Sequence, residues 1–395
     1  MLNKKHFLVI LFLIASSNLL YAQKEIDTKN TAYYTEMKSL QTAVQNNLYD
    51  KASGNYRVVA DSTKWEKKGD YLRKFTYLWS LCALYQADNE IEKIDKSADL
   101  MDPLLKVMNK YYNPAPPAPG YSDYIMKLKP GERYYDDNQW IGITALNAYE
   151  RTNKKPDLQL GKLIYDFMMT GYDTVLGGGL YWKETSKSSK NTCSNGPGVL
   201  VALQLYQVTN NKTYLDTGLM LYRWVNENLK APSGLYWDNI RTRDGDISKP
   251  ILSYNTGTML ESNIYLFECT KDKKYLEEAN AIADSSLSFF YGKGKFRDGY
   301  WFNAVLLRAY QHLLKYNKDT KYIIGFKKCL DYAVRNNKNE QGLFTGREGV
   351  LSLVEQGGML EILARYAWLE SHYDFGNKAF LVPTQSSKNS TALTN

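Results

Sequence analysis

The sequence predicts an all-α fold, an (α/α)6 barrel built from about twelve helices in six hairpins. Two recurring sequence marks, and the apolar periodicity between them, support this prediction. Apolar residues between the marks recur every three or four positions, which is the spacing of one helix face. One such series is Tyr214, Leu215, Leu219, Tyr222 and Val225. This spacing argues against an all-β fold, and an open α-solenoid is the alternative arrangement of the same helices.

The first mark is a short polar turn between two apolar helical stretches. Its instances are residues 152–155, 209–212, 270–273 and 317–320, with Ala87-Asp88-Asn89-Glu90 as an earlier member. The four later turns start 57, 61 and 47 residues apart. Self-similarity of this length is typical of architectures that repeat a pair of helices.

The second mark is a glycine followed closely by an aromatic residue in the longer loops. It occurs at Gly54-Asn55-Tyr56, Gly179-Leu180-Tyr181-Trp182, Gly234-Leu235-Tyr236-Trp237, Gly294-Lys295-Phe296 and Gly342-Leu343-Phe344. Short and long connections therefore alternate. We expect short turns at one end of the helical ring and long loops at the other, where functional residues tend to lie.

The marks and the periodicity together predict the helix positions. The expected helices are 31–50, 71–87, 90–111, 138–151, 157–172, 195–208, 212–229, 254–269, 273–290, 300–316, 319–336 and 351–370.

The N-terminus has the features of a secretory signal peptide. Residues 1–22 combine a basic start with the apolar run 7–14, which is too short to span a bilayer. Cleavage near Ala22 would export the protein to the periplasm or beyond it; a retained anchor is the alternative. Loss of two lysines would lower the net charge from +8 to +6. We expect one domain over 23–375, a mobile tail over 376–395 and no later membrane span.

Composition excludes several function classes. The hydrophobic content of 44% is too high for a disordered chain, and the surplus of basic residues is spread out, which argues against nucleic-acid binding. Beyond the signal segment only His312 and His372 remain, which argues against a His-based zinc site and a Ser-His-Asp triad. We expect no metal and no cofactor. The four cysteines, which contain no CxxC pair and are expected as buried free thiols, are Cys82, Cys193, Cys269 and Cys329.

Two adjacent acids form the sharpest candidate site. Asp136 and Asp137 end a Pro-rich loop and open an apolar helix, beside Tyr134, Tyr135 and Trp140. Helix capping alone would explain two acids at a helix start. However, the pair lies on the long-loop face among rings that can stack on sugars, in a chain poor in histidine. A carboxyl pair suits glycoside hydrolysis.

The chemistry of a retaining glycosidase fits such a pair. It needs two carboxyl groups about 5–5.5 Å apart, one as nucleophile and one as general acid/base. Neighbouring residues at a helix start can reach this separation. The mutual repulsion of two close acids would also raise one pKa and keep that group protonated.

Several further motifs accompany the acids in a fixed order. They are Trp140 after the pair, the glycine-rich run at 177–182, residues 190–196, Tyr214-Leu215, residues 234–238 and residues 254–257. With this set, the chain resembles glycoside hydrolase family 76, the endo-α-1,6-mannanase family, over roughly 30–370. Two positions depart from the family pattern: Ile141 replaces a second Trp, and Thr256 replaces Gln in the usual Tyr-Asn-Gln-Gly.

The resemblance implies an (α/α)6 barrel and a retaining mechanism without a metal. It implies Asp136 as nucleophile, Asp137 as general acid/base and Asp238 in contact with the sugar, although Asp238 could also be a turn residue. Further candidates for substrate binding are Tyr135, Trp140, Trp182, Asn195, Trp237, Tyr254 and Asn255. The alternatives are loop packing for Trp182 and Trp237, and helix-start roles for Asn195, Tyr254 and Asn255. For Lys190 and Arg297, solvated or paired surface charges are expected.

The sequence therefore predicts an exported, monomeric endo-α-1,6-mannanase that cleaves the mannan backbone and retains configuration. The first alternative is a glycan-binding protein on the same barrel without turnover. The second is another (α/α)6 glycosidase, such as an unsaturated-uronide hydrolase, whose acidic substrates would suit a basic chain.

Overall fold

A computed structural model describes residues 27–61, 74–129, 131–346 and 349–373. The predicted signal segment 1–22 and the tail 376–395 lie outside the described residues. The described chain contains twelve α-helices, as predicted. They are α1 (Ala32–Asn47), α2 (Leu78–Ile94), α3 (Met101–Met108), α4 (Tyr135–Thr152), α5 (Lys155–Met169), α6 (Thr192–Thr209), α7 (Lys212–Asn228), α8 (Ser253–Thr270), α9 (Lys273–Tyr291), α10 (Tyr300–Asn317), α11 (Lys321–Asn336) and α12 (Leu353–His372).

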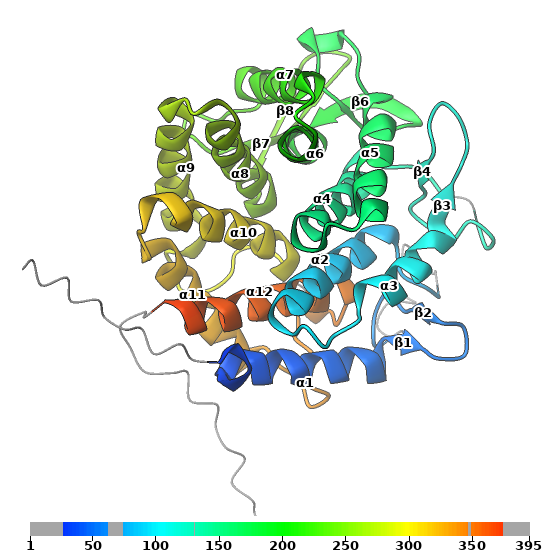
Figure 1. Cartoon of the computed structure of the whole chain (residues 1–395), viewed down its shortest axis with the longest axis vertical. Coiled ribbons are helices and arrows are strands. Elements are labelled where there is room, and N and C mark those ends of the chain that lie inside the picture. The colour runs from blue at the N-terminus through cyan, green and yellow to red at the C-terminus, as the bar shows by residue number, and fades with distance from the viewer. Residues whose placement is uncertain (1–26, 62–73, 130, 347–348, 374–395) are drawn as a thin grey trace, which may run out of the picture.

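The helices form two concentric layers. The even-numbered helices α2 to α12 make an inner ring in which each packs on the next and α12 closes on α2. The odd-numbered helices lie outside them (Figure 1). This closure confirms the (α/α)6 barrel and excludes the open solenoid. Inner helices are buried on nearly all sides; in α6, every residue from Thr192 to Leu205 is buried.

The predicted short turns are confirmed, and they share one geometry. Asn153, Asn210, Lys271 and Lys318 each end an inner helix in the left-handed conformation, with φ between 56° and 60°. At the first turn, Thr152 Oγ1 donates to the Ala148 carbonyl and accepts from the Lys154 amide. The side chain thus satisfies groups that a helix end leaves unpaired.

The turn predicted at Ala87–Glu90 is wrong, because these residues lie inside α2. The second helix therefore spans 78–94 instead of 71–87, and α3 begins at Met101 instead of residue 90. The polar side chains are accommodated by buried partners. Arg365 Nη1 lies 3.2 Å from Glu90 Oε2, and Arg151 Nε donates to Asn89 Oδ1.

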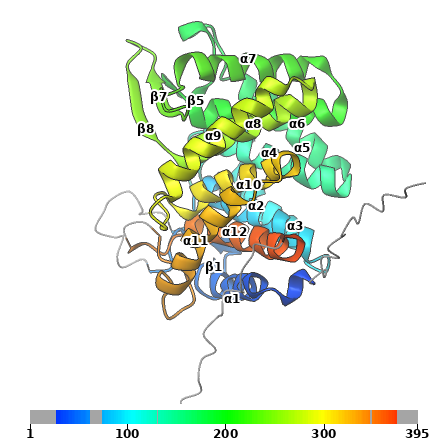
Figure 2. The same ribbon diagram turned by 90° about the vertical axis from the view of Figure 1, so that its left-hand side faces the viewer.

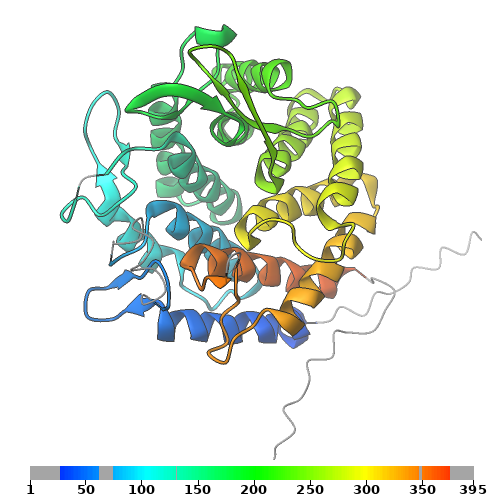
Figure 3. The same cartoon turned by 180° about the vertical axis from the view of Figure 1, so that it is seen from behind.

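The long loops contain strands that the periodicity did not predict. An antiparallel sheet runs in the order β5 (Tyr181–Lys183), β6 (Ser186–Asn191), β7 (Trp237–Arg241) and β8 (Ile247–Ile251). Two small hairpins join β1 (Tyr49–Asp50) to β2 (Asn55–Tyr56), and β3 (Tyr112–Asn113) to β4 (Gly120–Tyr121). Figure 2 shows the sheet at one end of the barrel, and Figure 3 shows it lying across that face of the ring.

The glycines of the second mark all have positive φ, between 65° and 83°. Gly179 shows why a side chain is not accepted there: φ is +83°, and a Cβ would lie 2.6 Å from the Trp224 ring. The loop turns back at this point, so that Leu180 pairs with Tyr172 at the end of α5.

Two further predictions concern the described chain as a whole. Its four cysteines are free thiols; three are buried and Cys269 is partly buried, as expected. None of the helices in the described ranges combines the length and apolar character that a membrane crossing requires.

Candidate active site

A cavity of about 800 Å³ opens on the long-loop face of the ring. Its wall is built from the starts of all six inner helices and from strands β5, β6 and β7. Asp136 and Asp137 both lie in this wall. Long loops and inner-helix N-termini therefore meet where the acid pair is located.

The acid pair occupies the first turn of α4, which begins three residues before the predicted start. Tyr134 is the N-cap in an extended conformation, with φ −95° and ψ 136°. Asp136 Oδ1 accepts a hydrogen bond from the Asp137 amide at 3.1 Å, and Asp136 Oδ2 accepts one from Trp182 Nε1 at 3.1 Å. The helix dipole and these donors favour a negative charge on Asp136.

The surroundings shift the pKa values of the two acids to different extents. Burial raises the pKa of both carboxyl groups above the usual aspartate range. For Asp136, hydrogen bonds from the Cys193 thiol, the Asp137 amide and the Trp182 indole oppose this rise in pKa. For Asp137, the negative charges of Asp136 and Asp123 raise the pKa further. Near neutral pH this arrangement favours a charged Asp136 beside a protonated Asp137.

Aromatic side chains form much of the remaining wall. Trp182 is 39% exposed and meets Tyr134 edge to face, with ring centroids 5.1 Å apart. Across the cavity, Tyr254 stacks on Phe302 at 4.1 Å. Trp140 lies deeper, with 1% exposure. Exposed ring faces beside carboxyl groups can contact the apolar faces of sugar rings.

The structure also brings Asp238 into the wall, from strand β7. Its carboxylate accepts hydrogen bonds from Asn239 Nδ2 at 2.8 Å and from Asn255 Nδ2 at 3.4 Å. Asn255 is fully buried and reaches the site through Asp238. Of the sequence-predicted residues, the wall thus includes Asp136, Asp137, Trp140, Trp182, Asp238 and Tyr254.

Three predicted binding residues point elsewhere. Tyr135 is buried against Phe167, and its hydroxyl lies 3.3 Å from that of Thr170. Trp237 lies beneath the Lys249 ammonium, which is 5.4 Å from its ring centroid. Asn195 is fully buried behind the wall.

The carboxamide of Asn195 forms hydrogen bonds with backbone groups. Its Oδ1 accepts from the Leu180 amide at 2.7 Å, and its Nδ2 donates to the carbonyl oxygens of Leu180 and Asn191. Asn195 therefore holds the loop to α6 from inside the helix, four residues after the N-cap Asn191, so it does not cap the helix as the alternative expected, and it does not line the cavity.

The two cations expected as solvated or paired surface charges differ in exposure, since only Arg297 lies at the surface, as expected. Lys190 is fully buried, and its Nζ donates to Asp173 Oδ1 and to the carbonyl oxygens of Val175 and Gly178. It is a paired charge inside the loop. Arg297 lies over the Phe289 ring, 4.1 Å from its centroid.

Several wall residues were not identified from the sequence. They include Tyr77, Trp79, Asp123, Cys193, Trp301, Phe302 and Glu355. A signal existed for one group: residues 300–302 are three consecutive aromatic residues at the start of a predicted helix after a long loop. Asp123 has no comparable local signal, because the fold of the preceding loop brings it near Asp137.

The described wall is strongly acidic. It contains five carboxyl side chains, and none of its residues within the described ranges is Lys, Arg or His; the acids are Asp123, Asp136, Asp137, Asp238 and Glu355. This contrasts with the formal charge of +8 on the whole chain. The described residues contain no group of three or more His, Cys, Asp or Glu side chains placed to hold a metal ion.

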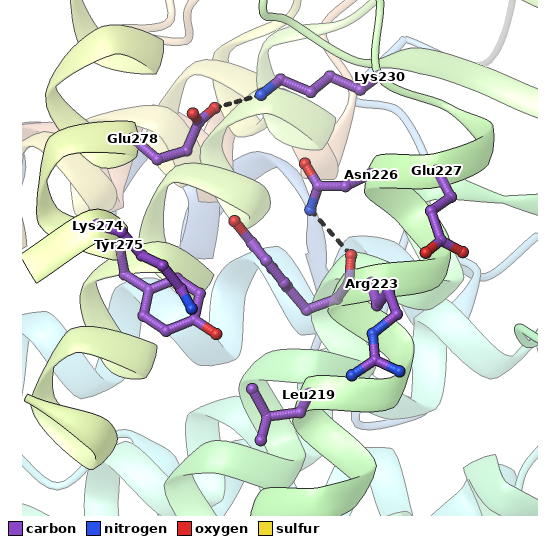
Figure 4. Close-up of a pocket in the computed structure, with 9 residues that line it drawn as sticks. Leu219, Arg223, Asn226, Glu227, Lys230, Lys274, Tyr275 and Glu278 are labelled. Atoms are coloured by element: carbon purple, nitrogen blue, oxygen red, sulfur yellow. Dashed lines mark hydrogen bonds and ion pairs between the residues drawn. The ribbon is translucent and has the colours of Figure 1, made fainter. Parts of the chain in front are cut away.

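A second cavity, of about 520 Å³, lies between the outer helices α7 and α9. Figure 4 shows that Lys230 and Glu278 form an ion pair there, and that the Asn226 carboxamide donates to a backbone carbonyl. Opposite charges are neutralised in this groove, whereas the first cavity places two acids side by side. The first cavity is therefore the candidate active site.

The chain is similar to known proteins over most of its length. The profile described as glycosyl hydrolase family 76 matches residues 34–330. Mannan endo-1,6-alpha-mannosidase DCW1 of Candida glabrata is 28% identical over 185 residues, which are 43% of this chain and 42% of that protein. DCW1 of Saccharomyces cerevisiae is 28% identical over 187 residues, or 43% and 41% of the two chains. The aligned part of this chain thus spans less than half the length of these curated relatives.

Solved structures share the fold. A family 76 α-mannanase of Bacteroides thetaiotaomicron superposes with a TM-score of 0.78 at 24% identity, covering 87% of this chain and 98% of that one. An inactive α-1,6-mannanase variant of Salegentibacter, with two consecutive aspartates replaced by asparagine, was solved with α-1,6-mannotriose. It superposes with a TM-score of 0.68 at 24% identity, covering 85% and 99%.

Proposed function

We propose, as this chain belongs to glycosyl hydrolase family 76, that it is an endo-acting α-1,6-mannosidase that cleaves mannan with retention of configuration. One observation carries the proposal: a partly buried acid pair whose two members differ in what surrounds them. Asp136 accepts hydrogen bonds from Cys193, Trp182 and backbone amides, whereas Asp137 has two neighbouring negative charges. A retaining glycosidase needs one charged and one protonated carboxyl group.

In the first step, a carboxylate oxygen of Asp136 attacks the anomeric carbon of a mannose unit. Asp137 gives its proton to the glycosidic oxygen, so that the C1–O bond breaks and the shortened chain leaves. A covalent ester then joins the mannose to Asp136. Asp137, now a carboxylate, takes a proton from water, whose oxygen attacks the same carbon and releases Asp136. Both carboxyl groups return to their starting states.

The other wall residues receive roles from their positions. We propose that Asp238 binds hydroxyl groups of the mannose at the cleavage point, with Asn255 and Asn239 holding its carboxylate. Trp182 and Tyr254 offer ring faces to the sugar. The similar α-1,6-mannanase of Salegentibacter, whose inactive variant was solved with α-1,6-mannotriose, supports this substrate class.

The acidic wall bears on the alternative of an unsaturated-uronide hydrolase. A uronate would bring another negative charge among five carboxyl side chains with no cation in the described wall. Such like-charge contact is unfavourable. The described part of the wall therefore does not share the basic character of the whole chain, and it suits a neutral glycan better than a uronate.

Product analysis of residues 23–395 on unbranched α-1,6-mannan tests the proposal. The unchanged protein is expected to release oligosaccharides, and Asp136→Asn and Asp137→Asn are expected to lose at least about 10³-fold in rate, because each removes one half of the acid and nucleophile pair. Circular dichroism of both variants is the control for folding. Binding of mannan without any product would instead support the non-catalytic alternative.

Azide separates the two roles. With an aryl α-1,6-mannobioside, azide is expected to give the mannobiosyl azide of α configuration in Asp137→Ala, by attack on the covalent ester after the phenol has left. In Asp136→Ala the ester cannot form, so azide displaces the phenol directly and gives the mannobiosyl azide of β configuration. The opposite assignment of products would reverse the roles of the two acids.

A further inference from the structure

Three inner helices are joined to the long loops by the same side-chain contact. The fourth residue after the N-cap of α4, α6 and α12 carries a carboxamide that binds both backbone groups of one loop residue. The oxygen accepts from its N–H and the nitrogen donates to its carbonyl, at distances of 2.7 to 3.0 Å. The pairs are Asn138 with Tyr121, Asn195 with Leu180, and Gln356 with Phe344.

Helix α8 departs from this pattern. Its N-cap is Leu252, so the equivalent position is Thr256. The loop residue that corresponds to Leu180 and Phe344 is Tyr236, because each of the three forms an isolated antiparallel bridge to a residue two or three positions after the preceding outer helix.

The backbone geometry indicates where the Tyr236 amide and carbonyl point. Its bridge to Lys230 is flanked by hydrogen bonds from Ala231 N to Leu235 O at 2.8 Å and from Trp237 N to Leu229 O at 2.9 Å. Lys230 and Tyr236 are thus a non-hydrogen-bonded pair, in which both residues turn their N–H and C=O groups outward. Those of Tyr236 therefore point away from Lys230, toward α8.

The start of α8 contains polar atoms that lack partners. Ser253 Oγ, Asn255 Oδ1 and Thr256 Oγ1 are buried, and within the described part of the chain no hydrogen bond reaches them. Tyr236 itself is fully buried. A threonine side chain is too short to bind both backbone groups as a carboxamide does. Buried groups of this kind are normally paired with protein or with ordered water.

We infer that a buried water molecule takes the place of the carboxamide at α8. It accepts from the Tyr236 amide, donates to the Tyr236 carbonyl and bonds to Thr256 Oγ1, three partners of the kind that hold internal waters. Strand β7 begins at the next residue and carries Asp238. The strand that presents Asp238 is therefore attached to α8 by a water and by the 3.4 Å contact from Asn255.

This makes Thr256 a positioning residue for Asp238, a consequence that rests on the proposed function. The carboxamides at α4, α6 and α12 hold their loops directly, whereas the start of β7, which is also paired with β6 and β8, contacts α8 through a water. Substitution of Thr256 should change how firmly Asp238 is held without touching the acid pair.

Two substitutions of Thr256 test whether the inferred water is present. Thr256→Gln supplies the missing carboxamide, displaces the water and is expected to raise the thermal midpoint by about 1–3 °C. Thr256→Val keeps the shape, removes the hydroxyl and is expected to lower the midpoint. As a matched control, Gln356→Thr removes an existing carboxamide from α12 and should also lower the midpoint. A crystal structure of the unchanged protein is expected to show the water bonded to Tyr236.

Absence of that water, or a Thr256→Gln variant that melts at or below the unchanged protein, would overturn the inference. The functional consequence has its own measurement. On α-1,6-mannotetraose, Thr256→Gln is expected to lower KM about threefold with little change in kcat, because Asp238 is held in place before binding. An unchanged KM would refute the positioning role. If the unchanged protein is inactive on mannan, the proposed function is refuted. The thermal and crystallographic measurements still test the water.

Discussion

At the scale of single residues, the protonation states of the acid pair depend on a few donors. Trp182 supplies one of the hydrogen bonds to Asp136, and it also forms part of the cavity wall. Because Asp136 must be charged to act as nucleophile, a donor that stabilises its charge also sets the lower pH limit of activity.

Replacement of Trp182 by phenylalanine should therefore shift the pH profile. Trp182→Phe keeps a ring against Tyr134 but removes the N–H donor, so the pKa of Asp136 rises and less of it is charged at low pH. The acidic limb of the kcat/KM profile is expected to move upward by about 0.5–1 pH unit. The basic limb, which reflects loss of the Asp137 proton, should stay in place. An unchanged acidic limb would show that the indole hydrogen bond is unimportant for Asp136.

The same scale shows what local sequence can reveal about a site. The acid pair and Trp182 stand next to recognisable neighbours in the chain, so their place in the wall was predicted. Tyr135 was predicted by adjacency alone, yet the first turn of α4 directs its ring onto Phe167. Asp123 reaches the wall only through the fold of the loop that precedes α4, which no local pattern encodes.

At the scale of elements, the short turns could be predicted because they are local. A threonine bonds back to its own helix, and the next residue turns left-handed, so neighbouring residues decide the helix end. The break predicted near residue 88 failed because Asn89 and Glu90 have partners on other helices, Arg151 and Arg365. The sheet was missed because β6, with the sequence Ser-Lys-Ser-Ser-Lys-Asn, has no apolar alternation and depends on pairing.

Lys190 shows how one of these strands is fastened to its loop. Replacement by methionine keeps the buried stem but leaves the Asp173 carboxylate and the Val175 and Gly178 carbonyl groups without their donor. Lys190→Met is expected to lower the free energy of unfolding by about 2–4 kcal/mol, measured by denaturant unfolding.

Lys187 provides the matched control for this substitution. Its ammonium lies 3.9 Å from the same Asp173 carboxylate, but its side chain is 70% exposed. Lys187→Met should change the free energy of unfolding by less than about 0.5 kcal/mol. Equal effects of the two substitutions would show that burial of Lys190 contributes nothing to stability.

At the scale of the whole molecule, charge is unevenly distributed. The chain carries a formal surplus of +8, yet the described cavity wall contains five carboxyl side chains and no Lys, Arg or His. Nearby cations are engaged elsewhere: Lys190 is bonded to Asp173, and Arg308 is bonded to Glu261. A negatively charged substituent would thus enter the site without a counterion from this wall.

This distribution predicts discrimination by substrate charge. A phosphate on a mannose unit carries about −1.5 to −2 charges at neutral pH. An α-1,6-mannotetraose bearing a 6-phosphate at its non-reducing end is expected to be cleaved with at least about tenfold lower kcat/KM than the neutral tetraose at low salt, because like charges repel at close range. The difference should narrow at high salt if the phosphate meets the wall near solvent.

Glu355→Gln tests whether the negative charge of the wall causes this discrimination between the two tetraoses. The amide retains an oxygen that can accept from the Tyr300 backbone, as Glu355 Oε2 does now at 2.6 Å, and it removes one charge outside the acid pair. Discrimination between the two tetraoses should decrease in this variant while cleavage of the neutral one continues. Equal kcat/KM for both substrates in the unchanged protein would mean that the acidic wall does not select substrate, and that phosphate-bearing mannan is accepted as readily as neutral mannan.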